Sequence, residues 1–208
     1  MNNFYKLFLL FPLLIFGCKY KGIDDRNLSQ SINTLDMNIY SKEGEKLFSI
    51  KSPQSNYDKE KNIFNLKETT IDIFKDNKVE YIINSNKSKL SNNNKLVELN
   101  GNVVVKTINQ QNDNLTANSF TWNIQHSEYL LIGNVKFKNS LVTLVSNKAI
   151  LKNSTNIIKF FKPVKYKFNE NINNSGYEIN SDNAYYNINT KSVKFISKEA
   201  KVRSKIYF

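Results

Sequence analysis

Residue types that carry most enzyme chemistry are scarce in this chain of 208 residues. It has one cysteine, Cys18, and one histidine, His126. That scarcity removes most Cys/His metal sites, catalytic dyads and triads, and it excludes a disulfide within the chain. The sequence also has no Gly-rich phosphate loop, no Gly-x-Ser-x-Gly and no His-Glu-x-x-His. We therefore predict a protein that is not an enzyme and uses no metal or cofactor, with His126 as a bystander.

Cys18 points to a different chemistry, the acylation of a thiol. Near its N-terminus the chain has one basic residue, Lys6, followed by an apolar run over residues 7–16. This run is too short to span a ~30 Å hydrocarbon core. The run ends in Ile-Phe-Gly-Cys (15–18), which resembles the lipobox of bacterial lipoproteins. That resemblance implies cleavage before Cys18 and acylation of its thiol and of the new N-terminus. An ordinary signal peptide and an uncleaved anchor with an incidental cysteine are the alternatives.

These features divide the chain into three parts. We expect a signal peptide over residues 1–17, a lipidated N-terminus with a flexible tether over 18–34, and one β-rich domain over 35–208. Lys and Arg number 30 against 18 Asp and Glu in the whole chain. The excess has three interpretations: pairing with anionic head groups, contact with an anionic bilayer surface, or solubility alone. A nucleic-acid partner is disfavoured, because export separates the chain from nucleic acid and the lysines are dispersed.

Alternation of apolar and polar residues predicts strands throughout the domain. Val97, Leu99, Val103 and Val105 would share one face of a strand, and similar runs of β-branched and aromatic residues follow at regular distances. Asn-rich breaks separate the runs and are typical of hairpin connections. Apolar residues at helical spacing do not persist, so we expect an all-β fold.

The strands repeat with a period of about 30 residues. The motif Leu-Asn-Gly-Asn-Val (99–103) recurs as Leu-Ile-Gly-Asn-Val (131–135), and Phe-Lys-Pro-Val (161–164) takes its place in a third copy. A second motif, Ser-Asn-Lys, starts at residues 85 and 146, with weaker copies at 117 and 181. Such a period indicates stacked units that bury a shared core. Glycine within a strand predicts a bulge or corner at which the sheet folds over.

Four segments in register resemble the LptC family of lipopolysaccharide-export proteins. They are residues 37–50, 66–74, 81–90 and 99–103. The later repeats are of the OstA-like kind shared with the bridging protein LptA, so the resemblance covers residues 35–167, with an extra repeat to 208. It implies an antiparallel OstA/LptC-like β-jellyroll of stacked ~30-residue repeats, open at both ends. One departure is the lipid expected on Cys18, where well-known members have an N-terminal transmembrane helix.

The resemblance also implies a function. The chain would receive lipopolysaccharide from an inner-membrane ABC transporter of the LptB/LptF/LptG type and pass it to an LptA-type bridge. The bridge would add a strand to an open edge, and the strand-like tail over residues 202–208 is our candidate. The protein would act at the periplasmic side of the inner membrane, with an outer-membrane anchor as the alternative. A structural envelope lipoprotein without a lipid ligand, a scaffold or adhesin, would have the same sequence pattern.

A carrier of this kind would hold acyl chains against the inward face of its strands, whereas in a scaffold the same residues would form an ordinary packed core. The inward residues predicted by alternation are Ile71, Ile73, Tyr81, Ile83, Val97, Leu99, Val103, Val105, Phe120, Trp122, Leu131, Val135, Phe137, Val164 and Tyr166.

Overall fold

The computed structural model describes residues 29–91, 93, 95–108, 113–152, 154–169, 176–198 and 201–207. Within these residues the fold is all-β, as predicted, with twelve antiparallel strands in one sheet and no helix. No helix long and apolar enough to cross a membrane occurs there. The strands are β1 (Ser29–Tyr40), β2 (Lys46–Asp58), β3 (Ile63–Lys75), β4 (Lys78–Ser91), β5 (Leu96–Thr107), β6 (Asn114–Asn123), β7 (Glu128–Lys138), β8 (Val142–Lys152), β9 (Ile157–Asn169), β10 (Gly176–Asn187), β11 (Val193–Ile196) and β12 (Arg203–Tyr207).

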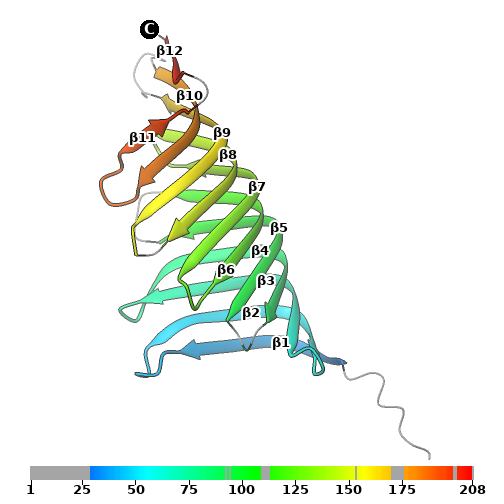
Figure 1. The fold of residues 1–208 in the computed structure, drawn as a ribbon. Helices are drawn as coiled ribbons and strands as arrows, with labels where there is room; N and C mark the ends of the chain where they lie inside the picture. Colours follow the sequence, from blue (N-terminus) through cyan, green and yellow to red (C-terminus); the bar gives the residue numbers. More distant parts are fainter. Residues whose placement is uncertain are drawn as a thin grey trace, which may run out of the picture.

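Each strand from β1 to β10 pairs with the next along the chain, and β12 pairs with β10 beside β11. The strands therefore stack along one long axis, from the blue β1 at one end to β12 at the other (Figure 1). The sheet bends across this axis but does not close, because β1 is hydrogen-bonded only to β2. Because neighbouring strands are antiparallel, the chain reverses its direction from each strand to the next.

The sheet begins earlier than the sequence predicts. Residues 29–34, expected in the tether, form the first half of β1, and residues 29–33 pair with residues 54–58 of β2. This half is polar and mostly exposed, so it lacks the apolar alternation that marks the other strands. Backbone hydrogen bonds hold it, together with a hydrogen bond that the Ser55 hydroxyl donates to the carbonyl of Ile32. Cys18 and the expected signal peptide lie outside the described residues.

A row of interruptions runs the length of the sheet and bends it. In every pair from β1–β2 to β9–β10 the ladder skips residues at the same level, and we call this row the seam. Its members are residues 34, 53, 68, 86, 101–102, 118, 133–134, 147, 162–163 and 182. Gly101 and Gly133 lie in it with φ of 76° and 77°, each followed by an Asn at 49°. Left-handed backbone of this kind is accessible to Gly and tolerated by Asn, so the predicted corner at these glycines is confirmed.

Serine hydroxyls stabilise the seam from within the strands. Ser52, Ser85, Ser146 and Ser181 each donate a hydrogen bond to the carbonyl oxygen two residues later, over 2.8, 3.3, 3.0 and 3.0 Å. These carbonyls lie where the ladder is interrupted, so the hydroxyl supplies a partner that the neighbouring strand does not. Three of the four serines are copies that the sequence repeat identified. Ser52 is a further copy that it missed, because Pro53 follows it in place of Asn.

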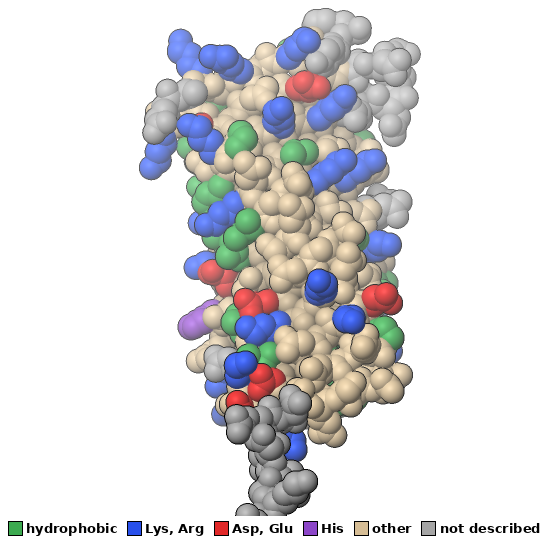
Figure 2. Space-filling view, turned by 90° about the vertical axis from the view of Figure 1, so that its right-hand side faces the viewer, with side chains coloured by type: hydrophobic (Ala, Val, Ile, Leu, Met, Phe, Trp, Pro, Cys, Tyr) green, Lys and Arg blue, Asp and Glu red, His purple; other side chains and the backbone are tan. Residues whose placement is uncertain are grey.

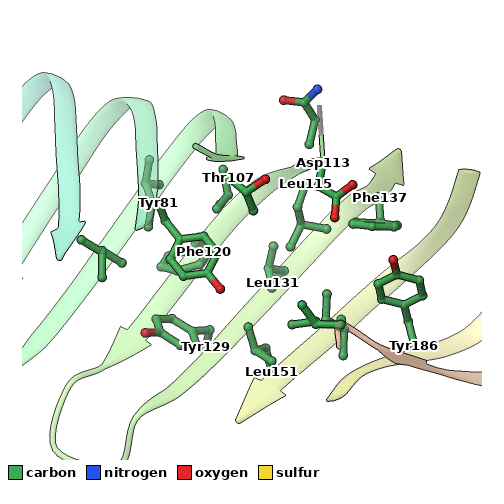
Figure 3. A pocket seen from close by; sticks show the side chains of 16 residues that line it. Tyr81, Thr107, Asp113, Leu115, Phe120, Tyr129, Leu131, Phe137, Leu151 and Tyr186 are labelled. Atoms are coloured by element: carbon green, nitrogen blue, oxygen red, sulfur yellow. The ribbon is translucent and has the colours of Figure 1, made fainter. Parts of the chain in front are cut away.

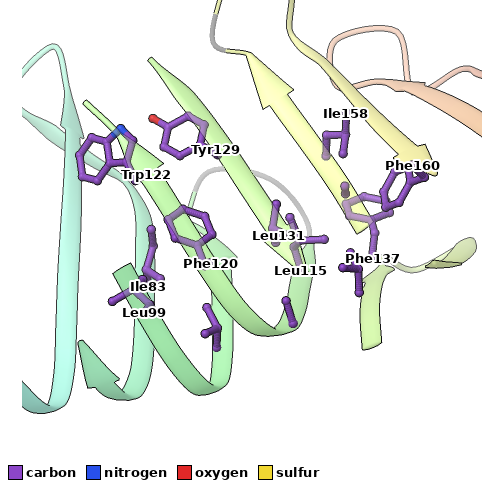
Figure 4. Packing of buried hydrophobic residues seen from close by; sticks show 14 of the residues in the cluster. Ile83, Leu99, Leu115, Phe120, Trp122, Tyr129, Leu131, Phe137, Ile158 and Phe160 are labelled. Carbon is purple, nitrogen blue, oxygen red and sulfur yellow. The ribbon is translucent and has the colours of Figure 1, made fainter. Parts of the chain in front are cut away.

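The seam divides the sheet into two walls that face each other. The first wall consists of the strand halves next to the turns β1–β2, β3–β4, β5–β6 and β7–β8, together with residues 164–169 of β9 and 176–181 of β10. The second wall consists of the opposite strand halves. Phe48 of the first wall packs on Trp122 of the second with ring centroids 4.8 Å apart, and Phe137 packs on Tyr186 at 4.6 Å. Figure 4 shows Phe120 and side chains of neighbouring strands pointing into the shared interior.

We predict that position 133, in the seam, requires glycine for two reasons: its positive φ and the lack of room for a Cβ atom. A Cβ at this position would lie 2.8 Å from Nδ2 of Asn118, whereas a Cβ at Gly44, which also has positive φ, would meet nothing within 4 Å. We expect Gly133→Ala to lower the free energy of unfolding by about 2–3 kcal/mol and Gly44→Ala by about 1 kcal/mol. Urea unfolding of both variants measures this. Equal losses would show that the contact with Asn118 carries no cost.

Candidate functional site

An apolar cavity of about 70 Å³ lies between the two walls in the middle of the molecule. Strands β3 to β7 supply its first wall, and β6 to β10 supply its second. Figure 3 shows Leu131, Leu151 and Phe120 directed into it, with Tyr81 and Tyr129 at one side and Tyr186 at the other. The cavity forms here because the strand halves of each wall present every second residue to the interior.

All fifteen residues predicted to face inward are buried or partly buried. Seven of them line the cavity: Ile73, Tyr81, Ile83, Val105, Phe120, Leu131 and Phe137. The other eight pack in the core outside the cavity lining: Ile71, Val97, Leu99, Val103, Trp122, Val135, Val164 and Tyr166. The structure thus brings half of the predicted set together in one place and distributes the rest along the interior.

The sequence missed nine residues that complete the lining: Thr107, Asp113, Asn114, Leu115, Tyr129, Leu151, Ile158, Tyr186 and Ile188. A signal existed for two of them. Tyr129 lies two residues before Leu131 on one face of β7, and Tyr186 lies two residues after the buried Ala184. Asp113 carries no signal of this kind, because it precedes the first residue of β6 and belongs to no alternation.

Three tyrosines, Tyr81, Tyr129 and Tyr186, are in the cavity lining. Burial raises the pKa of Tyr81 to about 12, with smaller contributions from the charges of Glu80 and Asp113. Burial likewise raises the pKa of Tyr129 and of Tyr186 to about 12. All three therefore stay protonated at neutral pH, and they present hydrogen-bond donors without adding charge.

Tyr186 carries a buried polar group without a partner. Its hydroxyl is the only buried side-chain polar atom of the described residues without a hydrogen-bond partner. The side chain of Asn139 approaches this hydroxyl and lowers the pKa of Tyr186, but it does not complete a hydrogen bond to it. A buried hydroxyl left in this state costs free energy, and an oxygen-bearing guest could satisfy it.

One ion pair joins the walls beside the cavity. Nζ of Lys191, in the turn between β10 and β11, lies 3.2 Å from Oδ2 of Asp113, next to the turn between β5 and β6. The Asp113 side chain is 9% exposed and that of Lys191 44%. The pair connects segments 78 residues apart and lies at the edge of the cavity, where the two walls meet.

The cavity is small for a ligand site. Pockets that hold drug-sized molecules have volumes of roughly 300–1,000 Å³, several times the ~70 Å³ found here. A long-chain guest therefore requires the walls to move apart. Separating them breaks no backbone ladder, because the described strands pair only within the continuous sheet and meet across the interior through side chains.

No metal site is present in the part of the chain that the structure describes. No group of three or more His, Cys, Asp and Glu side chains comes together there. His126 lies exposed in the turn between β6 and β7, where its backbone N–H donates to Oδ1 of Asn123.

Comparison with known proteins identifies similar sequences and structures. The family model described as lipopolysaccharide-assembly, LptC-related, matches residues 19–129, which is more than half of the chain. No curated protein matches. Among the solved structures that match is LptH, the LptA-homologous periplasmic component of the lipopolysaccharide transport device of Pseudomonas aeruginosa. It is 7% identical, with 77% of this chain and 94% of that chain covered, at a TM-score of 0.39.

Removing the unpartnered hydroxyl tests the polar balance of the cavity. We expect Tyr186→Phe to raise the free energy of unfolding by about 1 kcal/mol at pH 7. Tyr185→Phe is the matched control, because Tyr185 lies on the outer face of the same strand, and we expect a change within about 0.5 kcal/mol. A loss of stability in Tyr186→Phe would contradict this description of the cavity.

The same variants test the raised pKa of the Tyr186 hydroxyl. An unfolded tyrosine ionises near pH 10, whereas Tyr186 does so at about 12. Between these values the unfolded chain has lost protons that the folded chain keeps, so stability falls as the pH rises. Tyr186→Phe should lose less stability than the parent between pH 10 and 12.

Proposed function

This chain belongs to the LptC-related family of lipopolysaccharide-assembly proteins, and we propose that it is a lipid-anchored periplasmic component of lipopolysaccharide export. In this proposal it receives lipopolysaccharide from an inner-membrane ABC transporter of the LptB/LptF/LptG type. It holds the acyl chains between its two walls, with the polar head in water, and passes the lipid to an LptA-type bridge. Family membership supports a role in lipopolysaccharide transport; the anchor and the order of transfer are proposals.

The apolar interior between two separable walls is the observation that carries the proposal. The cavity lining is almost entirely aliphatic and aromatic, and its tyrosines are neutral at physiological pH. Acyl chains entering there would replace apolar side-chain contacts with similar ones, so little burial is lost when the walls part. The seam is the natural hinge, because its ladder is already interrupted.

Anchoring at Cys18 is compatible with the position of β1. The first strand begins at Ser29, so eleven residues starting at Cys18 could extend up to about 36–40 Å. A lipid on Cys18 would thus hold the N-terminal end of the sheet near the bilayer. The periplasmic side of the inner membrane is the proposed location.

Strand addition is the proposed mode of contact with the LptA-type partner. β12 pairs with β10 through residues 176–180 and has no strand on its other side in the described chain. Such an edge can accept a further strand. The same holds for the outer edge of β1, so either end of the sheet can be extended, and the C-terminal edge is our proposed site for the bridge.

The small volume of the cavity favours a second candidate, a structural envelope lipoprotein without a lipid ligand. In that case the walls remain closed, and the interior is an ordinary core. The two candidates differ in whether lipid ever reaches the residues of the cavity.

Photocrosslinking in cells that make lipopolysaccharide separates the candidates. A photoreactive residue at Tyr81 or Phe137, both in the cavity lining, should form lipopolysaccharide adducts. The same residue at Lys51 or Lys106, both exposed on the outer face, should not. Folded, expressed protein without adducts at either cavity position would favour the scaffold.

A second crosslinking pair tests the partner edge. Ile206 in β12 is 61% exposed, and Tyr40 at the end of β1 is 55% exposed, so the two sites are matched in accessibility at opposite ends of the sheet. With a purified LptA-type protein, a photoreactive residue at 206 should give crosslinks and one at 40 should not. The reverse pattern would assign the bridge to the β1 edge.

A further inference from the structure

Charge is distributed unevenly along the molecule. Residues 29–91 carry ten Lys and no Arg against nine Asp and Glu, whereas residues 92–208 carry 16 Lys and Arg against seven Asp and Glu. Figure 2 shows blue side chains crowding the end that carries the C-terminus, while red and blue mix toward the other end. Solubility alone does not require the charge to be concentrated in one half of the chain.

Strand register gathers part of this charge into an ordered band on the outer face. One cross-strand row reads Lys136, Val145, Lys165, Asn180 and Arg203 from β7 to β12. The neighbouring row reads Lys138, Thr143, Lys167, Glu178 and Lys205. We call the six cations of these rows the basic band. They point outward because the alternating residues of β7 and β9, such as Val135, Phe137 and Tyr166, are buried.

The band has a regular spacing. Its cations lie on every second strand, about 10 Å apart, and the two rows are about 7 Å apart along each strand. These distances are comparable with the Debye length of about 8 Å at physiological ionic strength, so the charges act together on one anionic surface. Glu178 is the only carboxylate among the ten positions, and its Oε1 lies 3.8 Å from Nζ of Lys167.

An apolar side chain lies exposed within the band. Val145, between Lys136 and Lys165 in the first row, is 38% exposed. Cations with an exposed apolar side chain between them are typical of surfaces that bind at the interface of an anionic bilayer. An acidic protein would use the charges but would leave the exposed Val145 without a specific role.

We propose that the basic band binds the surface of a bilayer containing anionic phospholipids. The choice of a membrane rests in part on the proposed anchor at Cys18, which would keep the domain near a bilayer, but the test does not use that anchor. The band lies near the opposite end of the sheet from residue 29. Both contacts together would lay the long axis of the domain along the membrane.

Vesicle binding by residues 18–208 with Cys18→Ser tests the proposal, because this chain has neither the apolar run of residues 7–16 nor a thiol that can be acylated at residue 18. We expect binding to vesicles that mix phosphatidylglycerol with phosphatidylcholine, much weaker binding to phosphatidylcholine alone, and a loss in high salt. Removing three charges of one row, with Lys136→Gln, Lys165→Gln and Arg203→Gln, should weaken binding to the anionic vesicles on the order of a hundredfold.

The matched control removes three exposed charges from the balanced half, with Lys51→Gln, Lys67→Gln and Lys87→Gln. It should weaken binding several-fold at most. Thermal unfolding of both triple variants must match the parent, which separates binding from folding. Equal losses in the two variants would mean that net charge alone is responsible, and an absence of binding to anionic vesicles would point to an anionic partner of another class. Either result would overturn the proposal.

Discussion

The fold depends on one repeated interruption of backbone hydrogen bonding. Every strand pair from β1–β2 to β9–β10 skips residues at the seam, and without that row the sheet would stay open, with both of its faces in contact with water. Gly101 and Gly133 allow the local left-handed backbone, and serine hydroxyls satisfy carbonyls that the ladder leaves. The bend turns one sheet into two walls that bury each other's apolar face.

The same bend produces the apolar interior. The walls meet through ring contacts and the pair Asp113–Lys191, while their backbone hydrogen bonds all lie within the continuous sheet. The described part of the molecule therefore has two hydrogen-bonded walls, which join at the seam, and an apolar interior that is closed by contacts between side chains. These are the properties that a lipid carrier needs, since the guest must be exchanged without unfolding of the sheet.

Sequence patterns predicted the strands, the period and the inward face because each depends on local alternation. They also predicted the corner at Gly101 and Gly133, because a positive φ directly favours glycine. They did not predict the strand at residues 29–34. This segment has little apolar alternation, and its extended structure depends on hydrogen bonds to β2. Asp113 and Tyr186 could not be assigned to one cavity, because their approach depends on how the walls cross. The basic band was hidden for the same reason: dispersed lysines become neighbours only through register.

Tying the two walls together tests the central claim that lipid enters by their separation. Asp113→Cys and Lys191→Cys, in a chain with Cys18→Ser, can be joined by a short bifunctional thiol reagent, since the two side chains meet at 3.2 Å in the parent. The measurement is lipopolysaccharide binding before and after joining. The account predicts that the open double variant binds and that the joined form does not. Undiminished binding by the joined protein would show that the interior between the walls is not the lipid route.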